Sequence, residues 1–273
     1  MSGSSGHQRH RREAVVATWD PEAYLVYSEE RGRPFDELVA RVAADGPRRV
    51  VDFGCGPGQL TATLAQRWPE AHIVGVDSSP QMIEASVPHA SARISFELGD
   101  VARWSPTERV DIVISNATLQ WIPGHRELFA RWVDGLVPGG WFAFQVPGNF
   151  AEPSHRMLAG LADDPRFAAA TAGVERPDAE DASTYLADLS ELGCQVDAWE
   201  TTYLHVLTGP DPVLRWISGT GARPVLQALS AGQRTVFERE YAEMLREAYP
   251  PQPFGTVLPF RRVFVVARKS DSA

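Results

Sequence analysis

The sequence predicts an α/β fold with a seven-stranded, mixed and mostly parallel sheet that carries helices on both faces. Short apolar runs alternate with helical patterns of about ten residues between residues 34 and 147, which is typical of right-handed βαβ units. A glycine-rich turn directly follows the first apolar run. About fifty residues with helical patterns precede the last apolar run, so we expect a helical insertion at about 207–258 before the last strand.

The first part of the chain is predicted to contain three strands and three helices. Pro34 stands at a first-turn position and is followed by apolar residues at helical spacing. Ser79 is a suitable N-cap for the third helix. In chain order, we expect a helix at 34–42, a strand at 49–53, a helix at 60–68, a strand at 72–77, a helix at 80–87 and a strand at 94–98.

The remainder is predicted to add four strands and further helices. The clearest helix spans 231–249, where Val236, Tyr241, Met244 and Leu245 share one face and charged residues fill the other. In chain order, we expect a strand at 110–115, a helix at 125–133, a strand at 141–146, helices at 151–161 and 184–192, a strand at 196–206, the helix at 231–249 and a strand at 262–268. We interpret residues 15–273 as a single domain.

The charge is unevenly distributed along the 273 residues, whose formal net charge is −9. Basic minus acidic residues give 17 − 29 = −12 for residues 1–204 and 9 − 6 = +3 for residues 205–273. Nucleic-acid binding is not expected, because phosphate neutralisation needs clustered Lys and Arg. Arginines in the last third could instead hold a small carboxylate by bidentate hydrogen bonds, although a compositional bias toward arginine also explains them.

Composition also limits the cellular setting. Residues 1–14 are polar and basic without an apolar core, so we interpret them as a flexible leader or tag and not as a signal peptide. No apolar run approaches the roughly 20 residues that a membrane helix needs. Cys55 and Cys194 are too few for a disulfide framework or a multi-cysteine zinc site, and a reducing, cytoplasmic setting is expected.

The glycine-rich turn is the strongest functional signal. It reads Asp52-Phe-Gly54-Cys-Gly56-Pro-Gly58-Gln59 and lies where the first strand ends and a helix begins. Glycines there allow a tight turn and let the backbone approach a ligand closely. The third glycine comes one residue earlier than in a dinucleotide fingerprint, and the leading acid would repel a pyrophosphate but suits a cationic amino-acid ligand. A tight turn without a ligand is the alternative interpretation.

Polar residues follow the next three strands as well. Asp77 ends the second strand, Asp100 and Val101 follow the third, and Asn116 and Trp121 lie at and beyond the end of the fourth. Each has a local explanation as a cap, a turn or a solvated carboxylate. Four such elements in this order favour one ligand site at the carboxyl edge of the sheet.

Several segments of the sequence resemble the trans-aconitate 2-methyltransferases, a family of class I S-adenosylmethionine-dependent methyltransferases with a Rossmann-like fold. The resemblance covers residues 18 to 268 approximately. It is carried by the segments that begin at Trp19 (Trp-Asp-Pro-Glu-Ala-Tyr-Leu), Arg31 (Arg-Gly-Arg-Pro), Asp52, Asp77 (Asp-Ser-Ser-Pro-Gln-Met-Ile), Ser115 (Ser-Asn-Ala-Thr-Leu-Gln-Trp-Ile), Gly193 (Gly-Cys), Trp199 (Trp-Glu-Thr-Thr-Tyr), Thr220 (Thr-Gly-Ala-Arg-Pro) and Phe264 (Phe-Val-Val-Ala). It implies a cytoplasmic enzyme that forms a monomethyl ester on a carboxylate of trans-aconitate or a related small polycarboxylate, with S-adenosylhomocysteine as the second product and without a metal.

The resemblance also implies where the methyl donor binds. Asp77 would accept the ribose hydroxyls, whereas Asp100 and the Val101 amide would meet the adenine edge. Aromatic residues of an N-terminal lid at about 15–33 would close over the donor, although ordinary packing is an equal alternative for them. The predicted cofactor-binding residues are Trp19, Tyr24, Asp52, Gly54, Gly56, Gly58, Gln59, Asp77, Ser78, Met82, Asp100, Val101, Asn116 and Trp121.

The acceptor needs cations and no general base, because a carboxylate is already ionised at neutral pH. Catalysis would therefore depend on orientation and on excluding water. Arg223 is the first choice, because Gly and Pro flank it on a loop of the insertion; Arg261 and Arg262 before the last strand are further candidates. The predicted substrate-binding residues are Arg223, Arg31, Arg33, Gln145, His125 and Tyr241. A solvated arginine, a helix-terminal histidine and a core tyrosine are the structural alternatives for members of this set.

Two other functions remain open at this point. A malonyl-acyl-carrier-protein methyltransferase shares a segment of the type found at Ser115, and its partner would require an exposed basic patch. A non-catalytic S-adenosylmethionine-binding module would keep the loop without an acceptor site. Methylation of nucleic-acid bases is disfavoured, because no Pro-Pro-aromatic run follows Asn116.

Overall fold

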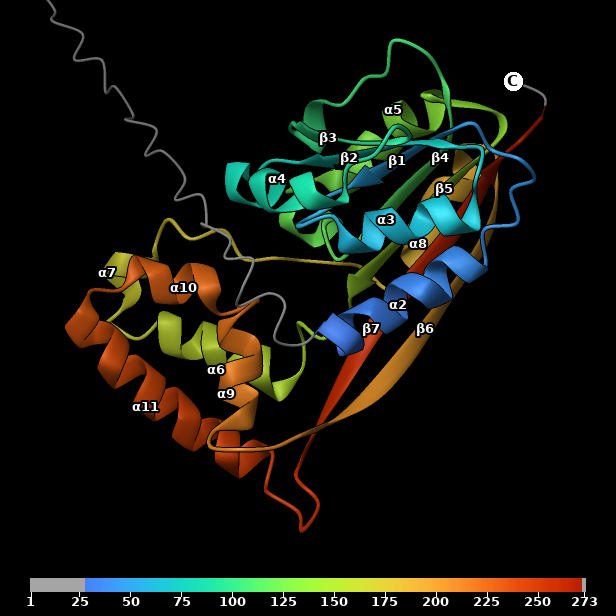
Figure 1. Ribbon diagram of the computed structural model, residues 1–273. Helices are drawn as coiled ribbons and strands as arrows, with labels where there is room; N and C mark the ends of the chain where they lie inside the picture. The colour runs from blue at the N-terminus through green and yellow to red at the C-terminus, as the bar shows by residue number, and fades with distance from the viewer. Residues whose placement is uncertain (1–27, 272–273) are drawn as a thin grey trace, which may run out of the picture.

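Seven strands form one mixed sheet in the order β3-β2-β1-β4-β5-β7-β6 (Figure 1). The computed structural model describes residues 28–271, with side chains from residue 32 onward. Strands β1 to β5 are parallel, whereas β7 is antiparallel to both β5 and β6. The strands span Arg49–Phe53 (β1), His72–Asp77 (β2), Ile94–Leu98 (β3), Val110–Asn116 (β4), Leu136–Pro147 (β5), Cys194–Leu207 (β6) and Thr256–Lys269 (β7). The predicted seven-stranded, mostly parallel sheet is confirmed.

Helices cover both faces of this sheet, as expected from the alternating pattern. The α-helices span Ser28–Ala40 (α2), Gln59–Arg67 (α3), Pro80–Ser86 (α4), Phe129–Asp134 (α5), Pro153–Ala162 (α6), Ala168–Thr171 (α7), Ala182–Glu191 (α8), Pro212–Ser218 (α9), Arg223–Ala228 (α10) and Ala231–Ala248 (α11). Single 3₁₀ turns span Val87–His89, Val101–Arg103, Leu119–Trp121 and His125–Leu128. The helix predicted at 125–133 is therefore a 3₁₀ turn followed by the short helix α5.

Alternate residues of the strands point to opposite faces of the sheet and belong to two separate apolar clusters. On β4, Ile112 and Ile114 pack with residues of α2 and α3, whereas Val113 packs with residues of α5 and α8 on the opposite face. All three are buried, as expected for a parallel strand that is covered on both sides. This packing fixes the positions at which the strands end and the site loops begin.

A third apolar cluster forms a helical lobe below the sheet (Figure 1). Helices α9, α10 and α11 belong to the insertion predicted at 207–258, but the cluster also includes residues of α6 and α7. β7 starts at Thr256, six residues before the predicted start, because its outer part continues to pair with β6 as a two-stranded ribbon. Pro259 and the pair Arg261–Arg262 interrupt the apolar pattern there, which concealed the outer part of the strand.

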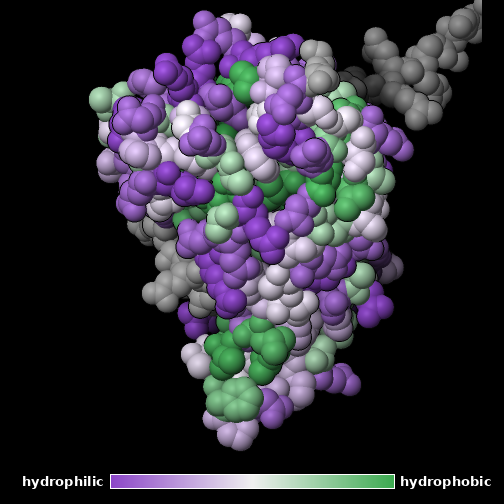
Figure 2. Space-filling view, turned by 90° about the vertical axis from the view of Figure 1, so that its right-hand side faces the viewer, coloured by the Kyte–Doolittle hydropathy of each residue, from purple (hydrophilic) through white to green (hydrophobic). Residues whose placement is uncertain are grey.

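The β6–β7 ribbon has one face toward α2 and the lobe and one toward solvent. Tyr203, His205 and Leu207 are buried, whereas Leu204 and Val206 between them are exposed. Figure 2 shows hydrophobic residues gathered at the lower end of this side of the molecule. Within residues 28–271, no helix combines the length and the apolar character that crossing a membrane would require.

Candidate functional site

The glycine-rich turn begins immediately after β1, and its glycines serve two different purposes. Gly54, Gly56 and Gly58 all have positive φ, at 71°, 55° and 87°. A Cβ on Gly54 would lie 2.0 Å from the Thr118 hydroxyl oxygen, and a Cβ on Gly58 would lie 2.7 Å from the Phe96 ring. A Cβ on Gly56 would meet no protein atom within 4 Å. Packing therefore requires the outer two glycines, whereas Gly56 borders open space.

Asp77 stabilises this turn from the end of the neighbouring strand β2. Its Oδ2 accepts a hydrogen bond from the Gly56 amide at 2.9 Å, and its Oδ1 accepts one from the Ser79 amide at 2.8 Å. Burial raises the pKa of the carboxyl above its ordinary value, and the two amides act in the opposite direction. Because a carboxylate can accept about four hydrogen bonds, Asp77 keeps capacity for a ligand.

Asp52 lies beneath the turn, away from open space. Thr61 on α3 donates a hydrogen bond to its Oδ2 at 2.6 Å, and the carboxyl is almost completely buried. Burial raises the pKa of Asp52 to about 7, and the negative charge of Asp77 adds to this effect. Asp52 therefore supports the turn from below and is not placed against a ligand by the geometry.

A cavity of about 350 Å³ opens above the ends of β1 to β4, and we call it the glycine-loop cavity. It brings together most of the predicted cofactor-binding residues. These are Gly54, Gly56, Asp77, Ser78, Met82, Asp100, Val101, Asn116 and Trp121. Asp52, Gly58 and Gln59 lie outside its lining, and Trp19 and Tyr24 lie outside the described residues. The sequence predicted one ligand site at the strand ends, and the nine residues named above line one cavity there.

A second cavity of about 80 Å³ adjoins the first, and we call it the Arg262 cavity. Asn116, Ala117 and Trp121 line both cavities and form their common wall. Ala117 adopts a left-handed backbone with φ of 55°, which is uncommon for a residue with a Cβ and turns the chain sharply after β4. The remaining lining residues are Gln120, Pro147, Asn149, Phe150, His155, Pro177, Trp216, Ile217, Thr220, Gly221, Phe260 and Arg262.

Arg262 supplies the positive charge of this cavity. It is only 5% exposed, its guanidinium lies 4.7 Å from the Phe260 ring centroid, and its Nη1 donates to Gln145 Oε1 at 3.3 Å. A buried arginine is costly unless an anion or hydrogen-bond acceptors compensate the charge. The preceding Arg261 lies on the other face of β7, where it binds Asp181 and Glu200 at 2.7 and 2.9 Å.

His155 contributes a neutral hydrogen-bond donor to the same cavity. Burial lowers the pKa of His155 to about 4, so the ring is uncharged at neutral pH. Its Nδ1 lies 3.2 Å from the Ser154 hydroxyl oxygen and 3.5 Å from Asn149 Nδ2. When these groups donate to Nδ1, the ring proton resides on Nε2, which is the nitrogen closest to Gly221 in the cavity wall.

None of the predicted substrate-binding residues with a described side chain lines the Arg262 cavity. Gln145 is completely buried beside it between Asn116 and Arg262. Arg223 begins α10 and is half-buried, three residues beyond Thr220 in the lining. Arg33 on α2 binds Glu37 at 2.8 Å, and the Arg31 side chain lies outside the described residues.

His125 and Tyr241 are bound into the protein interior. His125 Nε2 lies 2.9 Å from the Tyr185 hydroxyl and its Nδ1 lies 3.2 Å from the Ile122 carbonyl oxygen. Burial lowers the pKa of His125. The Tyr241 hydroxyl donates to the Ser154 carbonyl at 2.8 Å inside the helical lobe. Neither side chain lines the Arg262 cavity, and Tyr241 shows the core packing that was given as the alternative to its predicted role in substrate binding.

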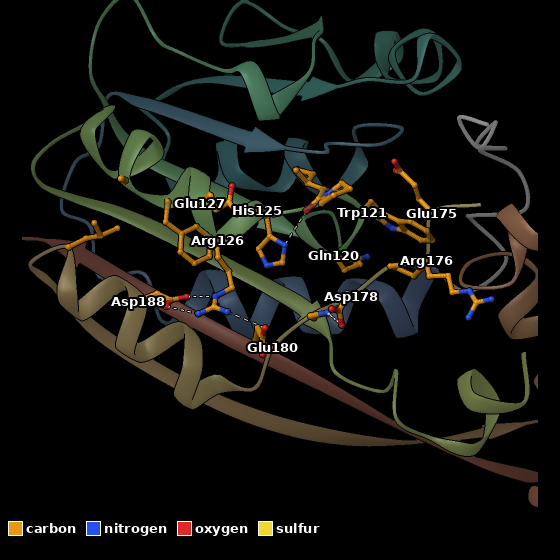
Figure 3. A pocket seen from close by; sticks show the side chains of 18 of the residues that line it. Gln120, Trp121, His125, Arg126, Glu127, Glu175, Arg176, Asp178, Glu180 and Asp188 are labelled. Atoms are coloured by element: carbon orange, nitrogen blue, oxygen red, sulfur yellow. Dashed lines mark hydrogen bonds and ion pairs between the residues drawn. The ribbon is translucent and has the colours of Figure 1, made fainter. Parts of the chain in front are cut away.

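A third, more open cavity of about 710 Å³ lies beside His125 (Figure 3). Figure 3 shows Arg126 beside Asp188 and Glu180, where Asp188 binds Nε at 2.6 Å and Nη2 at 2.8 Å, and Glu180 binds Nη1 at 3.2 Å. These carboxylates neutralise the Arg126 guanidinium. The Arg262 cavity has a buried guanidinium in its lining.

Sequence reasoning missed His155 and Asn149 and ranked Arg262 below Arg223. His155 lies in α6, which carries no motif that marks a site, and Asn149 lies in the connection after β5. A signal for Arg262 did exist, because a charged residue at an inward position of a strand demands a functional or structural reason. Using that signal required knowing which of the two adjacent arginines faces inward.

Comparisons with known proteins identify relatives along most of the chain. A family model described as "Methyltransferase domain" matches residues 50–140. The chain is 49% identical to a trans-aconitate 2-methyltransferase of Streptomyces avermitilis over 94% of this chain and 98% of that protein. It is 50% identical to one of Rhodococcus jostii over 92% of this chain and 99% of that protein.

Solved structures share the fold at much lower sequence identity. The YcgJ protein of Bacillus subtilis has a TM-score of 0.58 and 13% identity, covering 87% of this chain and 98% of that one. A phosphoethanolamine N-methyltransferase of Haemonchus contortus, solved with S-adenosylhomocysteine, has a TM-score of 0.54 and 16% identity over 87% of this chain and 52% of that one. These likenesses establish the Rossmann-like methyltransferase fold.

Proposed function

The chain belongs to the trans-aconitate 2-methyltransferase family, and we propose that it transfers the methyl group of S-adenosylmethionine to one carboxylate of trans-aconitate. The products are a monomethyl ester and S-adenosylhomocysteine. The observation that carries this proposal is the common wall of the two cavities at Asn116, Ala117 and Trp121. A methyl transfer requires adjacent sites for donor and acceptor, and this wall is where they meet.

The glycine-loop cavity fits S-adenosylmethionine chemically. Gly56 leaves room that a Cβ would occupy, and Asp77 and Asp100 provide carboxylates for ribose hydroxyls and an adenine amine. Asp77 and Asp100 also place carboxyl groups near a ligand that carries an ammonium and a sulfonium group. When bound, this cofactor supplies an activated methyl group on sulfur.

The Arg262 cavity fits a small carboxylic acid. The Arg262 guanidinium can bind a carboxylate through two parallel hydrogen bonds, and the His155 Nε2–H can donate one more. Trp216, Phe260 and Phe150 exclude water from the same space. A malonyl group on a carrier protein also ends in a carboxylate, so the product analysis below includes that substrate.

The residues around the acceptor orient it and do not need to remove a proton. A carboxylate with an ordinary pKa near 4 is ionised at neutral pH. His155 is neutral there and offers a donor, which suits carboxylate binding and does not suit general-base catalysis. Correct orientation of donor and acceptor is known to contribute up to about 7–11 kcal/mol to catalysis in favourable cases.

A product analysis tests the proposal. The protein is incubated with S-adenosylmethionine and, separately, with trans-aconitate, cis-aconitate, citrate, isocitrate and a malonyl-acyl-carrier protein, and each product is analysed by mass spectrometry. Trans-aconitate is expected to gain one methyl group, and S-adenosylhomocysteine is expected to form in equal amount. If only the carrier-bound substrate gains a methyl group, or if none does, the substrate assignment is refuted.

A further inference from the structure

Three polar side chains connect the two cavities through hydrogen bonds, and two of them, Gln145 and Arg262, are buried. Arg262 Nη1 donates to Gln145 Oε1 at 3.3 Å, and Gln145 Nε2 donates to Asn116 Oδ1 at 2.7 Å. The strands impose this arrangement, since Asn116 on β4 lies opposite Gln145 on β5, and Arg262 on β7 lies two residues from the partner of Gln145. Gln145 is 0% exposed and is not part of the lining of either cavity.

The chemistry of arginine gives this chain a fixed direction. A guanidinium has five N–H donors and no acceptor, so the group of Gln145 that faces it must be the amide oxygen. The amide nitrogen of Gln145 then faces Asn116 and must find an acceptor there, which is Oδ1. The remaining polar group of Asn116 is its Nδ2 amide, so the common wall offers an N–H donor and not a carbonyl oxygen.

We propose that Asn116 Nδ2 holds the reacting carboxylate of the acceptor at the common wall, and that Gln145 is a positioning residue that sets this amide by linking it to Arg262. The proposal rests on the proposed methyl transfer to a carboxylic acid and deepens it. An ionised carboxylate accepts hydrogen bonds only, so it is attracted by an N–H at this wall and repelled by a carbonyl oxygen. Arg262 binds a second carboxylate of the same molecule and simultaneously fixes the direction of the chain.

The position of Asn116 supports this role. It is the last residue of β4, it lines both cavities, and the left-handed Ala117 turns the backbone away directly after it. The Ala117 amide donates to the Gln145 carbonyl oxygen at 2.9 Å, which anchors the turn to β5. Backbone and side chain of Gln145 therefore both hold this point of the wall, and a strained residue persists only where its surroundings determine it in this way.

The substitution Gln145→Glu tests the direction of the chain. The introduced carboxylate accepts only, so it still binds Arg262 but forces the Asn116 amide to turn its nitrogen inward and its oxygen toward the acceptor. We expect kcat/KM for trans-aconitate to fall on the order of 10- to 100-fold at neutral pH, which corresponds to hydrogen bonds to charged groups. The affinity for S-adenosylhomocysteine, measured by calorimetry, should change less than about threefold, a range within ordinary variation of such contacts.

The pH profile separates positioning from structural damage. A protonated carboxyl has one O–H donor and one carbonyl acceptor, as the glutamine amide has, so the activity ratio of Gln145→Glu to the wild type should rise toward acidic pH. Gln145→Met keeps the volume and removes both hydrogen bonds, so its loss should be smaller and its ratio flat with pH. Gln195→Glu on the exposed side of β6 is the matched control and should behave as the wild type.

Asn116→Asp provides a second variant that does not place a new charge beside Arg262. It presents a carboxylate oxygen at the wall whichever way it turns, so kcat/KM for trans-aconitate should fall. Wild-type-like kcat/KM in Gln145→Glu and Asn116→Asp would overturn the proposal, as would equal losses in the Glu and Met variants without recovery at low pH. If the wild-type protein itself methylates none of the acids, the proposed function fails instead.

Discussion

The substitution Gly56→Ala distinguishes a ligand-facing glycine from a structural one. At φ of 55° an alanine is strained by roughly 1–2 kcal/mol, but its Cβ would meet no protein atom within 4 Å. The methyl group would instead project into the room that a bound cofactor occupies. Overpacking of this kind typically costs about 1–3 kcal/mol, so the affinity for S-adenosylhomocysteine should fall roughly 5- to 150-fold.

Gly46→Ala is the matched control for backbone strain. Gly46 has φ of 57°, its Cβ would also meet nothing within 4 Å, and it lies in the connection between α2 and β1, outside both cavities. Urea unfolding should show similar losses of stability for the two variants, whereas calorimetric titration with S-adenosylhomocysteine should show weakening for Gly56→Ala alone. Equal affinities in both variants would refute the placement of the cofactor against Gly56.

The remaining predictions concern charge. Arg262→Gln should raise the KM for trans-aconitate by about 10-fold or more, because a charged hydrogen bond is lost, while the affinity for S-adenosylhomocysteine stays constant. Steady-state kinetics measure this KM, and a rise in Arg223→Gln but not in Arg262→Gln would contradict the prediction. The folded-state pKa of His155 is about 4 against an ordinary 6.5, so it contributes stability that is present above pH 6.5 and lost as the pH falls toward 4. His155→Gln should remove about 3 kcal/mol of that pH dependence in urea titrations, and an unchanged slope would argue against a buried neutral ring. The pKa of Asp52 is raised from 3.8 to about 7, so its contribution is fully present below pH 3.8 and is lost as the pH rises through 7. Relative to the wild type, Asp52→Asn should therefore gain stability between pH 4 and pH 8 by up to about 4 kcal/mol, and a constant difference would show that the carboxyl titrates normally.

The sequence was sufficient for the sheet and for the residues at its carboxyl edge, because both follow from local patterns. The polar residue that follows a parallel strand lies at the same edge of the sheet as the polar residues that follow the neighbouring strands. This placement does not depend on contacts with distant parts of the chain. Asp77, Asp100 and Asn116 therefore needed only the correct strand ends, and the glycine-loop cavity contains all three.

The acceptor side depends on register and on contacts between distant segments, and local patterns do not specify these. Arg261 and Arg262 are adjacent, and only the pairing of Arg262 with Pro147 decides that the second faces inward. His155 reaches the cavity because α6 packs on α11, almost ninety residues further along the chain. Gln145 was expected to offer its amide to the substrate, but both ends of that amide are occupied by Asn116 and Arg262.

Arg262 also marks the place where two parts of the molecule join. Its pairing with Pro147 is the last contact between β5 and β7, and beyond it β7 continues with β6 alone into the helical lobe. The sheet therefore supplies Asn116, Pro147 and Arg262 to the cavity, and the lobe supplies His155, Trp216 and Gly221. The fold can thus keep one cofactor site at the strand ends, while the lobe residues that face Arg262 select the acceptor.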